Sequence, residues 1–151
     1  VRDTMMADES AAKLEKAHTD LPYTEVKTEV SIDRVTSAAN PRQMERVPAG
    51  ALFSPGELVF SVYEGSDCDP RKDIARLGAL FEAMQLLEDD YLGGLGSRGS
   101  GKIRFINIKV QARGGEDYLT KPQQVWEYAT LSKLLDDLEN LRAQVSQTLA
   151  V

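Results

Sequence analysis

Strict alternation of apolar and polar side chains near the start of the chain predicts a β-strand. Within residues 24–32, one face carries Val26, Thr28, Val30 and Ile32, and the other carries Glu25, Lys27, Glu29 and Ser31. This is the period of a strand with one solvated face. A cluster of turn-forming residues at 36–41 follows, and the chain then returns. The pattern predicts a long hairpin over residues 24–50, preceded within residues 5–17 by a short helix or a mobile connection.

Two further elements follow the hairpin. Alternating Leu58, Phe60 and Val62 predict a strand over residues 57–63. Asp69 followed by Pro70 is a typical helix start, with a capping acid before a first-turn proline. The apolar residues after it recur at spacings of three and four, as on one helix face: Ile74, Leu77, Phe81, Met84 and Leu87. We expect this helix to end near Tyr91.

The last part of the chain predicts a strand and a helical region. Residues 102–112 change phase, because Ile103 and Phe105 alternate in one register and Ile106, Ile108 and Val110 in the other. A β-bulge near Phe105 and Ile106 would reconcile the two registers. A helical region is predicted over residues 122–148, with the apolar stripe Leu131, Leu134, Leu135, Leu138, Leu141 and Val145. Its length favours a helix packed on its own sheet over a coiled coil.

The order of the predicted elements indicates a fold class. From residue 57 onward it is strand, helix, strand, helix, as in the second half of a ferredoxin-like fold. We therefore expect an α+β protein with an antiparallel sheet and covering helices, in which only the second half of the ferredoxin-like order is visible. A length of 151 residues fits one domain over residues 1–151.

The segment between the second predicted helix and the following strand is rich in glycine. Five glycines occur within nine residues: Gly93, Gly94, Gly96, Gly99 and Gly101. Neither G-x-G-x-x-G nor a Walker A loop fits, because those motifs follow a strand and open a helix, whereas this order is reversed. What remains is a backbone surface edged by Ser97, Arg98 and Lys102, whose amides and cations suit a run of phosphates. A tight helix-to-strand turn is the alternative.

The net charge of −6 conceals a local basic block. Residues 91–113 contain five basic residues and no acidic one, whereas residues 64–90 contain eight acidic and three basic residues. A block of this kind can face a polyanion while the acidic helix faces elsewhere. The alternative is that the charge only keeps the protein soluble.

Several kinds of site are excluded by the residue types. The single cysteine, Cys68, excludes an internal disulfide and a Cys-x-x-Cys metal knuckle, and the single histidine, His18, excludes a site with two histidines. One reduced cysteine suits the cytosol. No apolar run reaches the roughly 18 residues of a membrane span. The first residues lack the pattern of a signal peptide.

Two other groups of residues receive structural interpretations. Glu88, Asp89 and Asp90 are consecutive, so they point apart on a helix and are expected to form a solvated helix end rather than a metal site. Trp126 and Tyr128 could stack on bases, but packing in the core or as a lid is favoured.

Three segments resemble a known family. The segment LLEDDYLGGLGSRGSGKIRF at residues 86–105 resembles the glycine-rich signature of the RAMP superfamily of CRISPR-associated proteins. The segments YTEVKTEVSIDR at 23–34 and NPRQMERVPAG at 40–50 resemble the repeated backbone subunit of type III-A (Csm) effector complexes. The likeness covers residues 1–112, and the three motifs occur in the family's order.

The resemblance implies an RRM-like core with a protruding hairpin, incomplete at its N-terminus, and it also implies a site and partners. Residues 24–50 correspond to a thumb-like hairpin that wedges into the guide–target duplex, and residues 93–102 to a loop that binds the guide. The implied partners are CRISPR RNA, target RNA, other effector subunits and further copies of the chain in a cytoplasmic filament, with no membrane. The RNA-binding residues would be Arg34, Arg42, Arg46, Gly93, Gly94, Gly96, Ser97, Arg98, Gly99, Gly101 and Lys102.

One part of the family pattern has no counterpart here. Members of the family cleave target RNA with a divalent metal, using an aspartate in an N-terminal loop, and nothing before Val1 corresponds to that region. Asp33 lies in the thumb-like stretch and does not match the catalytic position. We therefore expect a C-terminal portion that keeps RNA-binding surface without catalytic or metal-binding residues or a cofactor. The alternative is a structural module with ferredoxin-like packing that binds a protein partner and no RNA.

Overall fold

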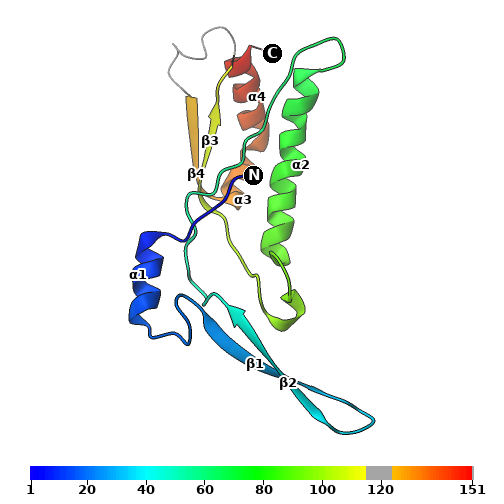
Figure 1. Ribbon diagram of the computed structural model, residues 1–151. Coiled ribbons are helices and arrows are strands. Elements are labelled where there is room, and N and C mark those ends of the chain that lie inside the picture. The colour runs from blue at the N-terminus through cyan, green and yellow to red at the C-terminus, as the bar shows by residue number, and fades with distance from the viewer. Residues whose placement is uncertain (115–123, 151) are drawn as a thin grey trace. The chain divides into compact units, whose positions relative to one another are not determined.

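The computed structural model describes residues 1–114 and 124–150 (Figure 1). The chain divides into two compact units, Val1–Phe60 and Ser61–Val151. The described strands form two separate two-stranded antiparallel sheets. The α+β class is therefore confirmed, whereas the ferredoxin-like arrangement and the single domain over residues 1–151 stay predictions. None of the described helices combines the length and apolar character needed to cross a membrane.

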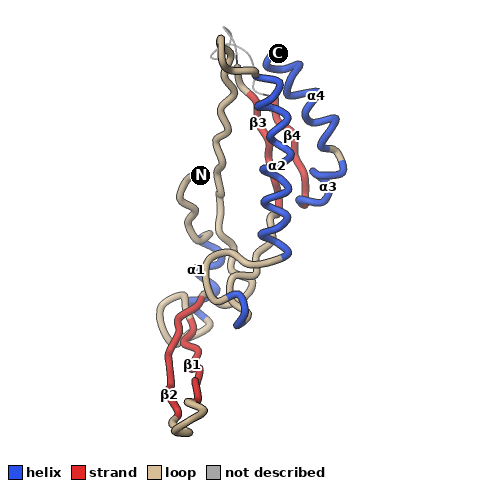
Figure 2. Tube along the Cα trace, turned by 90° about the vertical axis from the view of Figure 1, so that its right-hand side faces the viewer, coloured by secondary structure: helices blue, strands red, loops and turns tan. Residues whose placement is uncertain are grey.

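The first unit contains the hairpin that the alternating pattern predicts. Strands β1 (Glu25–Ile32) and β2 (Ala39–Arg46) pair over their full lengths and lie side by side as a ribbon (Figure 2). The turn occupies residues 33–38 rather than 36–41, because Pro41 is already part of β2. Proline is tolerated there since both strands of a two-stranded ribbon are edge strands.

Asp33 organises the turn of the hairpin. Its carboxylate accepts hydrogen bonds from the amides of Val35 at 2.8 Å and Thr36 at 3.2 Å. Its own amide donates to the Ala38 carbonyl oxygen at 3.0 Å. The two amides that donate to the carboxylate hold the pKa of Asp33 below its usual value. The Asp33 side chain thus holds the turn by accepting hydrogen bonds from backbone amides that have no partner in the ladder.

Helix α1 (Asp8–Lys16) precedes the hairpin, as predicted. The Ala7 amide donates to the Leu52 carbonyl oxygen at 2.8 Å. The Leu52 amide in turn donates at 2.8 Å to the hydroxyl of Ser10, which is buried. These bonds join the start of α1 to the segment after the hairpin.

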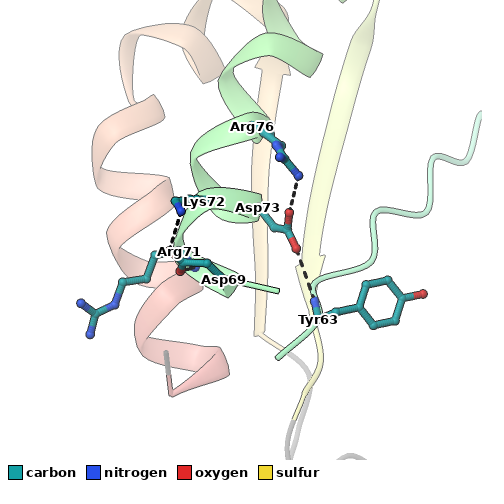
Figure 3. Close-up of polar contacts among 6 residues, drawn as sticks. All are labelled: Tyr63, Asp69, Arg71, Lys72, Asp73 and Arg76. Atoms are coloured by element: carbon teal, nitrogen blue, oxygen red, sulfur yellow. Dashed lines mark hydrogen bonds and ion pairs between the residues drawn. The ribbon is translucent and has the colours of Figure 1, made fainter. Parts of the chain in front are cut away.

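In the second unit, helix α2 (Pro70–Asp89) begins as predicted. The Asp69 carboxylate caps it by accepting a first-turn amide at 3.1 Å. Within the first turn, Asp73 accepts from Arg76 at 2.7 Å and from the Tyr63 amide at 3.5 Å (Figure 3). Four residues of the predicted apolar stripe are buried, namely Ile74, Leu77, Phe81 and Met84.

The remaining elements complete the core of the second unit. Strand β3 (Ile106–Ala112) pairs antiparallel with β4 (Gln124–Thr130), and helices α3 (Leu131–Asp136) and α4 (Leu138–Leu149) follow. Helix α3 contacts α2 and β4, and helix α4 contacts α2 and β3. The stripe of the last helical region lies in this core, with Leu131, Leu134, Leu141 and Val145 buried. Packing on its own sheet is confirmed.

Two predicted elements were wrong. Residues 57–63 are extended but form no strand among the described residues, because a strand needs a hydrogen-bonded neighbour. Several of their apolar side chains are consequently exposed, including Val59 and Tyr63.

The second wrong prediction is the start of the helical region over residues 122–148. Residues 124–130 form β4 instead, and Pro122 lies outside the described residues. The half-buried Trp126 and Tyr128 alternate with exposed Val125, Glu127 and Ala129, and this period of two explains the strand.

The phase change near Phe105 is real, but its cause differs from the predicted bulge. The ladder between β3 and β4 keeps one register, with Ile106 opposite Thr130 and Ile108 opposite Tyr128, so no residue is inserted within it. Instead, Asn107 adopts φ 53°, a left-handed conformation that asparagine tolerates. Phe105 and Ile108 therefore both pack against the core, whereas Ile106 is exposed.

Candidate nucleic-acid interface

The glycine-rich loop leaves the end of α2 and is closed at its neck by a backbone hydrogen bond. The Leu92 amide donates to the Gly101 carbonyl oxygen at 2.9 Å. Gly101 has φ +83°, and a Cβ atom there would lie 2.3 Å from the Leu92 carbonyl oxygen. Only glycine fits this close approach without moving the backbone.

Inside the loop, some amides are used by the loop itself and others are not. The amides of Arg98, Gly99 and Ser100 donate to the carbonyl oxygens of Leu95 or Gly96 around a short 3₁₀ turn, η1 (Gly96–Arg98). The amides of residues 93–97 donate to no acceptor in the part of the chain that the structure describes. Backbone amides without an acceptor of their own are available to donate to an anion.

The open side of the loop is bare backbone. A Cβ atom built on Gly93, Gly94 or Gly99 would meet no atom within 4 Å. The side chains of Ser97 and Arg98 are exposed beside it. A ligand can therefore approach the backbone closely here, which a larger side chain would prevent.

The opposite side of the loop rests on Tyr91. A Cβ atom on Gly96 would lie 1.9 Å from a ring carbon of Tyr91, so the ring occupies the space that a side chain would take. Gly96 is therefore a packing glycine, whereas Gly93, Gly94 and Gly99 border open space. The five glycines serve two different purposes.

Lys102 is engaged with the end of α2. Its ammonium group donates to the carbonyl oxygen of Glu88 and, at 3.3 Å, to that of Asp89. These are terminal carbonyl groups of the helix, where a cation is favourable. The Glu88 carboxylate accepts the Phe105 amide at 2.5 Å. Glu88 is thus partnered, although it was predicted to belong to a solvated helix end.

The three arginines predicted for the hairpin have different environments. Arg46 forms an ion pair with Glu25 across the ribbon at 2.5 Å. Arg34 lies in the turn and Arg42 in β2, and both side chains are exposed without a hydrogen-bond or ion-pair partner in residues 1–114 and 124–150. These arginines belong to the first unit and the loop to the second, so the structure groups them as two separate sets.

The aromatic residues of β4 have structural roles, as favoured from the sequence. Trp126 and Tyr128 pack against the core. The Tyr128 hydroxyl donates to the Asp137 carboxylate at 2.7 Å, which joins β4 to the junction between α3 and α4. Burial, followed by this bond, raises the pKa of Tyr128 to about 12. The same bond, with a second from Asn140, lowers the pKa of Asp137.

No candidate metal centre is present in the described part of the chain. There, no three or more histidine, cysteine, aspartate or glutamate side chains gather as metal ligands would. Cys68 is exposed and unpaired with another cysteine. The described residues therefore do not fit the divalent metal that the family resemblance implies for cleavage.

Sequence reasoning missed the residues that support the loop. Tyr91 and Glu88 carry no motif of their own, and their contacts with Gly96 and the Phe105 amide join positions five and 17 residues apart. The nearest signal was the pair of acids after Glu88 at a helix C-terminus, where acidic residues are unfavourable unless compensated.

Comparison with known proteins places the chain in a family. The family model described as the RAMP superfamily matches residues 8–104. A CRISPR system Cms endoribonuclease Csm3 from Methanothermobacter thermautotrophicus is 42% identical over 118 residues, which cover 78% of this chain and 45% of that protein. A protein of the same name from Methanocaldococcus jannaschii is 39% identical over 151 residues, covering 97% of this chain and 52% of that protein.

A third relative of the same name, from Mycobacterium tuberculosis, is 39% identical over 122 residues and covers 76% of this chain and 50% of that protein. The chain thus spans about half the length of the curated relatives it matches. Because the family model covers well over half of the sequence, the chain belongs to the RAMP superfamily.

Proposed function

We propose that this chain is part of a backbone subunit of a type III-A CRISPR effector complex and that it binds RNA through the glycine-rich loop. The observation that carries the proposal is the set of unused amides at residues 93–97, on a backbone that borders open space at Gly93 and Gly94. The names of the relatives, which are CRISPR endoribonucleases, support the same assignment.

In this proposal the loop holds phosphate groups and does not read bases. The amides of residues 93–97 and the guanidinium group of Arg98 contact the RNA backbone, and Gly93, Gly94 and Gly99 let it approach. Such contacts carry no sequence information, which fits a subunit whose specificity comes from base pairing between guide and target. The basic block over residues 91–113 adds favourable long-range attraction.

The hairpin is the second proposed contact. Arg34 and Arg42, at and near its turn, are exposed cations suited to phosphates of the guide–target duplex. Arg46 positions the ribbon through its ion pair with Glu25. The proposed partners are CRISPR RNA, target RNA, other effector subunits and further copies of this chain.

Target cleavage belongs to the whole protein in this proposal. The relatives are named endoribonucleases, but the chain covers about half of each. The described residues offer no cluster that fits a divalent metal, so no cleavage step is assigned to them. A binding role for this chain requires no such cluster.

A substitution that leaves the fold intact tests the loop contact. Gly94 has no positive φ, and a Cβ atom there meets nothing within 4 Å, so Gly94→Ala should leave the Tm unchanged. If RNA approaches the backbone at this point, the methyl group should weaken binding about tenfold, because phosphate oxygens can no longer reach the amides. The measurement is fluorescence anisotropy with a labelled single-stranded RNA.

Gly65→Ala provides the matched control. Gly65 lies in the same unit, also lacks a positive φ, and a Cβ atom there also meets nothing within 4 Å. Equal affinities for the wild-type protein and both variants would remove the loop from the interface, whatever the rest of the chain binds.

A module that binds a protein partner without RNA is the second candidate. The observation in its favour is the extended segment over residues 57–63, where Val59, Phe60 and Tyr63 expose 59%, 41% and 64% of their surface. Exposed apolar residues in an unpaired extended segment invite a partner strand. If this is the main role, the purified chain should carry no nucleic acid, as read from the ratio of absorbance at ~260 and ~280 nm, and the Gly94→Ala variant should behave as wild type.

A further inference from the structure

We propose that Lys102 positions the glycine-rich loop and is not itself a ligand of the phosphate groups. The inference rests on the proposed function, since it says how the RNA-binding loop is held. From the sequence alone, Arg98 and Lys102 look like equivalent phosphate ligands. The inference gives them different roles: Arg98 binds phosphate, and Lys102 holds the loop in place.

The first support is the set of bonds that Lys102 makes. Its ammonium group donates hydrogen bonds to the carbonyl oxygens of Glu88 and Asp89, at the C-terminal end of α2. An ammonium group has three donors, and two of them are used here. Most of its donor capacity is therefore committed to the end of α2, where a cation compensates the terminal carbonyl groups.

The second support is the position of Lys102 in the chain. It follows Gly101, whose carbonyl oxygen accepts the Leu92 amide and closes the neck of the loop. Three residues later, the Phe105 amide is bound by the Glu88 carboxylate. Lys102 therefore lies between two contacts that join the outgoing chain to the end of α2.

The third support comes from the other wall of the loop. The ring of Tyr91 fills the space beside Gly96, so the loop is fixed from within as well as at its neck. The loop is thus held by contacts of four residues, which keep the unused amides of residues 93–97 in one arrangement: Glu88, Tyr91, Gly101 and Lys102. Fixing a loop before binding lowers the entropy lost when RNA binds.

The experiment measures the salt dependence of RNA binding for two single-charge variants of the full chain. Removing a phosphate ligand lowers the slope of log affinity against log salt concentration by about 0.7 for a single strand. Lys102→Gln should weaken binding about threefold to tenfold, because the loop is no longer held, and leave that slope as in wild type. Arg98→Gln should lower the slope. Arg71→Gln, on an exposed cation at the start of α2, controls for the loss of one charge.

A charge-neutral variant separates loosening of the loop from loss of a cation. Gly101→Ala places a Cβ atom against the Leu92 carbonyl oxygen and strains a backbone with φ +83°. It should weaken RNA binding with an unchanged slope, as Lys102→Gln does. Hydrogen exchange of the Leu92 amide, measured without RNA, should be faster in both variants than in wild type.

The results distinguish this inference from the proposed function. A lower slope for Lys102→Gln, or unchanged exchange at Leu92, overturns the positioning role while RNA binding by the loop stands. If the wild-type chain binds no RNA, the proposed function fails, and exchange at Leu92 still decides whether Lys102 holds the loop.

Discussion

At the residue scale, single hydrogen bonds from side chains fix the places where elements meet. Tyr128 joins β4 to the junction of α3 and α4 through Asp137, and Glu88 joins the end of α2 to the Phe105 amide. Neither bond follows from sequence spacing, since a tyrosine in an alternating strand and an acid at a helix end have many possible partners. The sequence indicated that Tyr128 is a core residue, and the structure adds its polar partner.

The bond between Tyr128 and Asp137 predicts a pH-dependent stability. The folded pKa of Asp137 lies below its unfolded value, so the bond contributes fully above about pH 4 and its contribution is lost as pH falls through the folded pKa. The pKa of Tyr128 is raised from about 10 to about 12, so the bond contributes fully below about pH 10 and its contribution is lost as pH rises from there through about 12.

Tyr128→Phe should therefore lower the Tm by a few degrees at neutral pH and by less in acid. Thermal denaturation followed by circular dichroism at neutral pH and below about pH 3 measures the difference. A difference between wild type and Tyr128→Phe that is as large in acid as at neutral pH would show that the ionised Asp137 carboxylate contributes nothing.

At the element scale, the sequence predicted best where a pattern was long and a cap was present. The stripe of α2 with its Asp69 cap, and the alternation of β1, needed no tertiary information. The failures have tertiary causes. Residues 57–63 alternate like a strand but pair with no other strand in the described chain. The left-handed backbone conformation of Asn107 changes which side chains of β3 face the core.

The turn of the hairpin offers a prediction at this scale. Asp33→Ala removes the acceptor of the Val35 and Thr36 amides, so the turn should loosen. Exchange of the amides of Asp33 and Ser37, which donate to backbone oxygens across the turn, should become severalfold faster. The measurement is hydrogen exchange followed by NMR.

Asp33→Asn is the control for that prediction. Its amide oxygen still accepts both hydrogen bonds without the charge, so exchange should stay close to wild type. Equal acceleration in both variants would show that the charge of Asp33, and not its position as an acceptor, holds the turn.

The contact between α2 and α4 offers a second prediction at the element scale. A Cβ atom on Gly78 would lie 2.0 Å from the Arg142 guanidinium group, which donates to the Ala75 carbonyl oxygen at 2.6 Å. Gly78→Ala should displace the end of this flexible side chain and lose its hydrogen bond, which costs about 1 kcal/mol. Alanine in the interior of α2 stabilises the helix by about 0.5–1 kcal/mol, so the free energy of unfolding should stay within about 1 kcal/mol of wild type. Urea denaturation measures the change, with Gly65→Ala as the control at an open position. A loss well above about 1 kcal/mol in Gly78→Ala would show that Arg142 cannot move aside.

At the scale of the whole molecule, the average charge is misleading and its distribution is informative. A net charge of −6 argues against RNA binding, yet residues 91–113 carry only basic charge and contain the loop with unused amides. The sequence located this region through its glycines. It could not divide them into packing and open positions, because Tyr91 and the Leu92 carbonyl oxygen reach Gly96 and Gly101 only in the folded chain.

The salt dependence of RNA binding by the wild-type chain and Arg98→Gln tests the central claim most directly. The account predicts that the wild-type protein binds single-stranded RNA with an affinity that falls as salt rises, and that Arg98→Gln binds more weakly with a slope smaller by about 0.7. Arg71→Gln should keep the wild-type slope. An RNA affinity that is absent, or a slope that is the same for Arg98→Gln and wild type, would contradict the assignment of the loop to the RNA backbone.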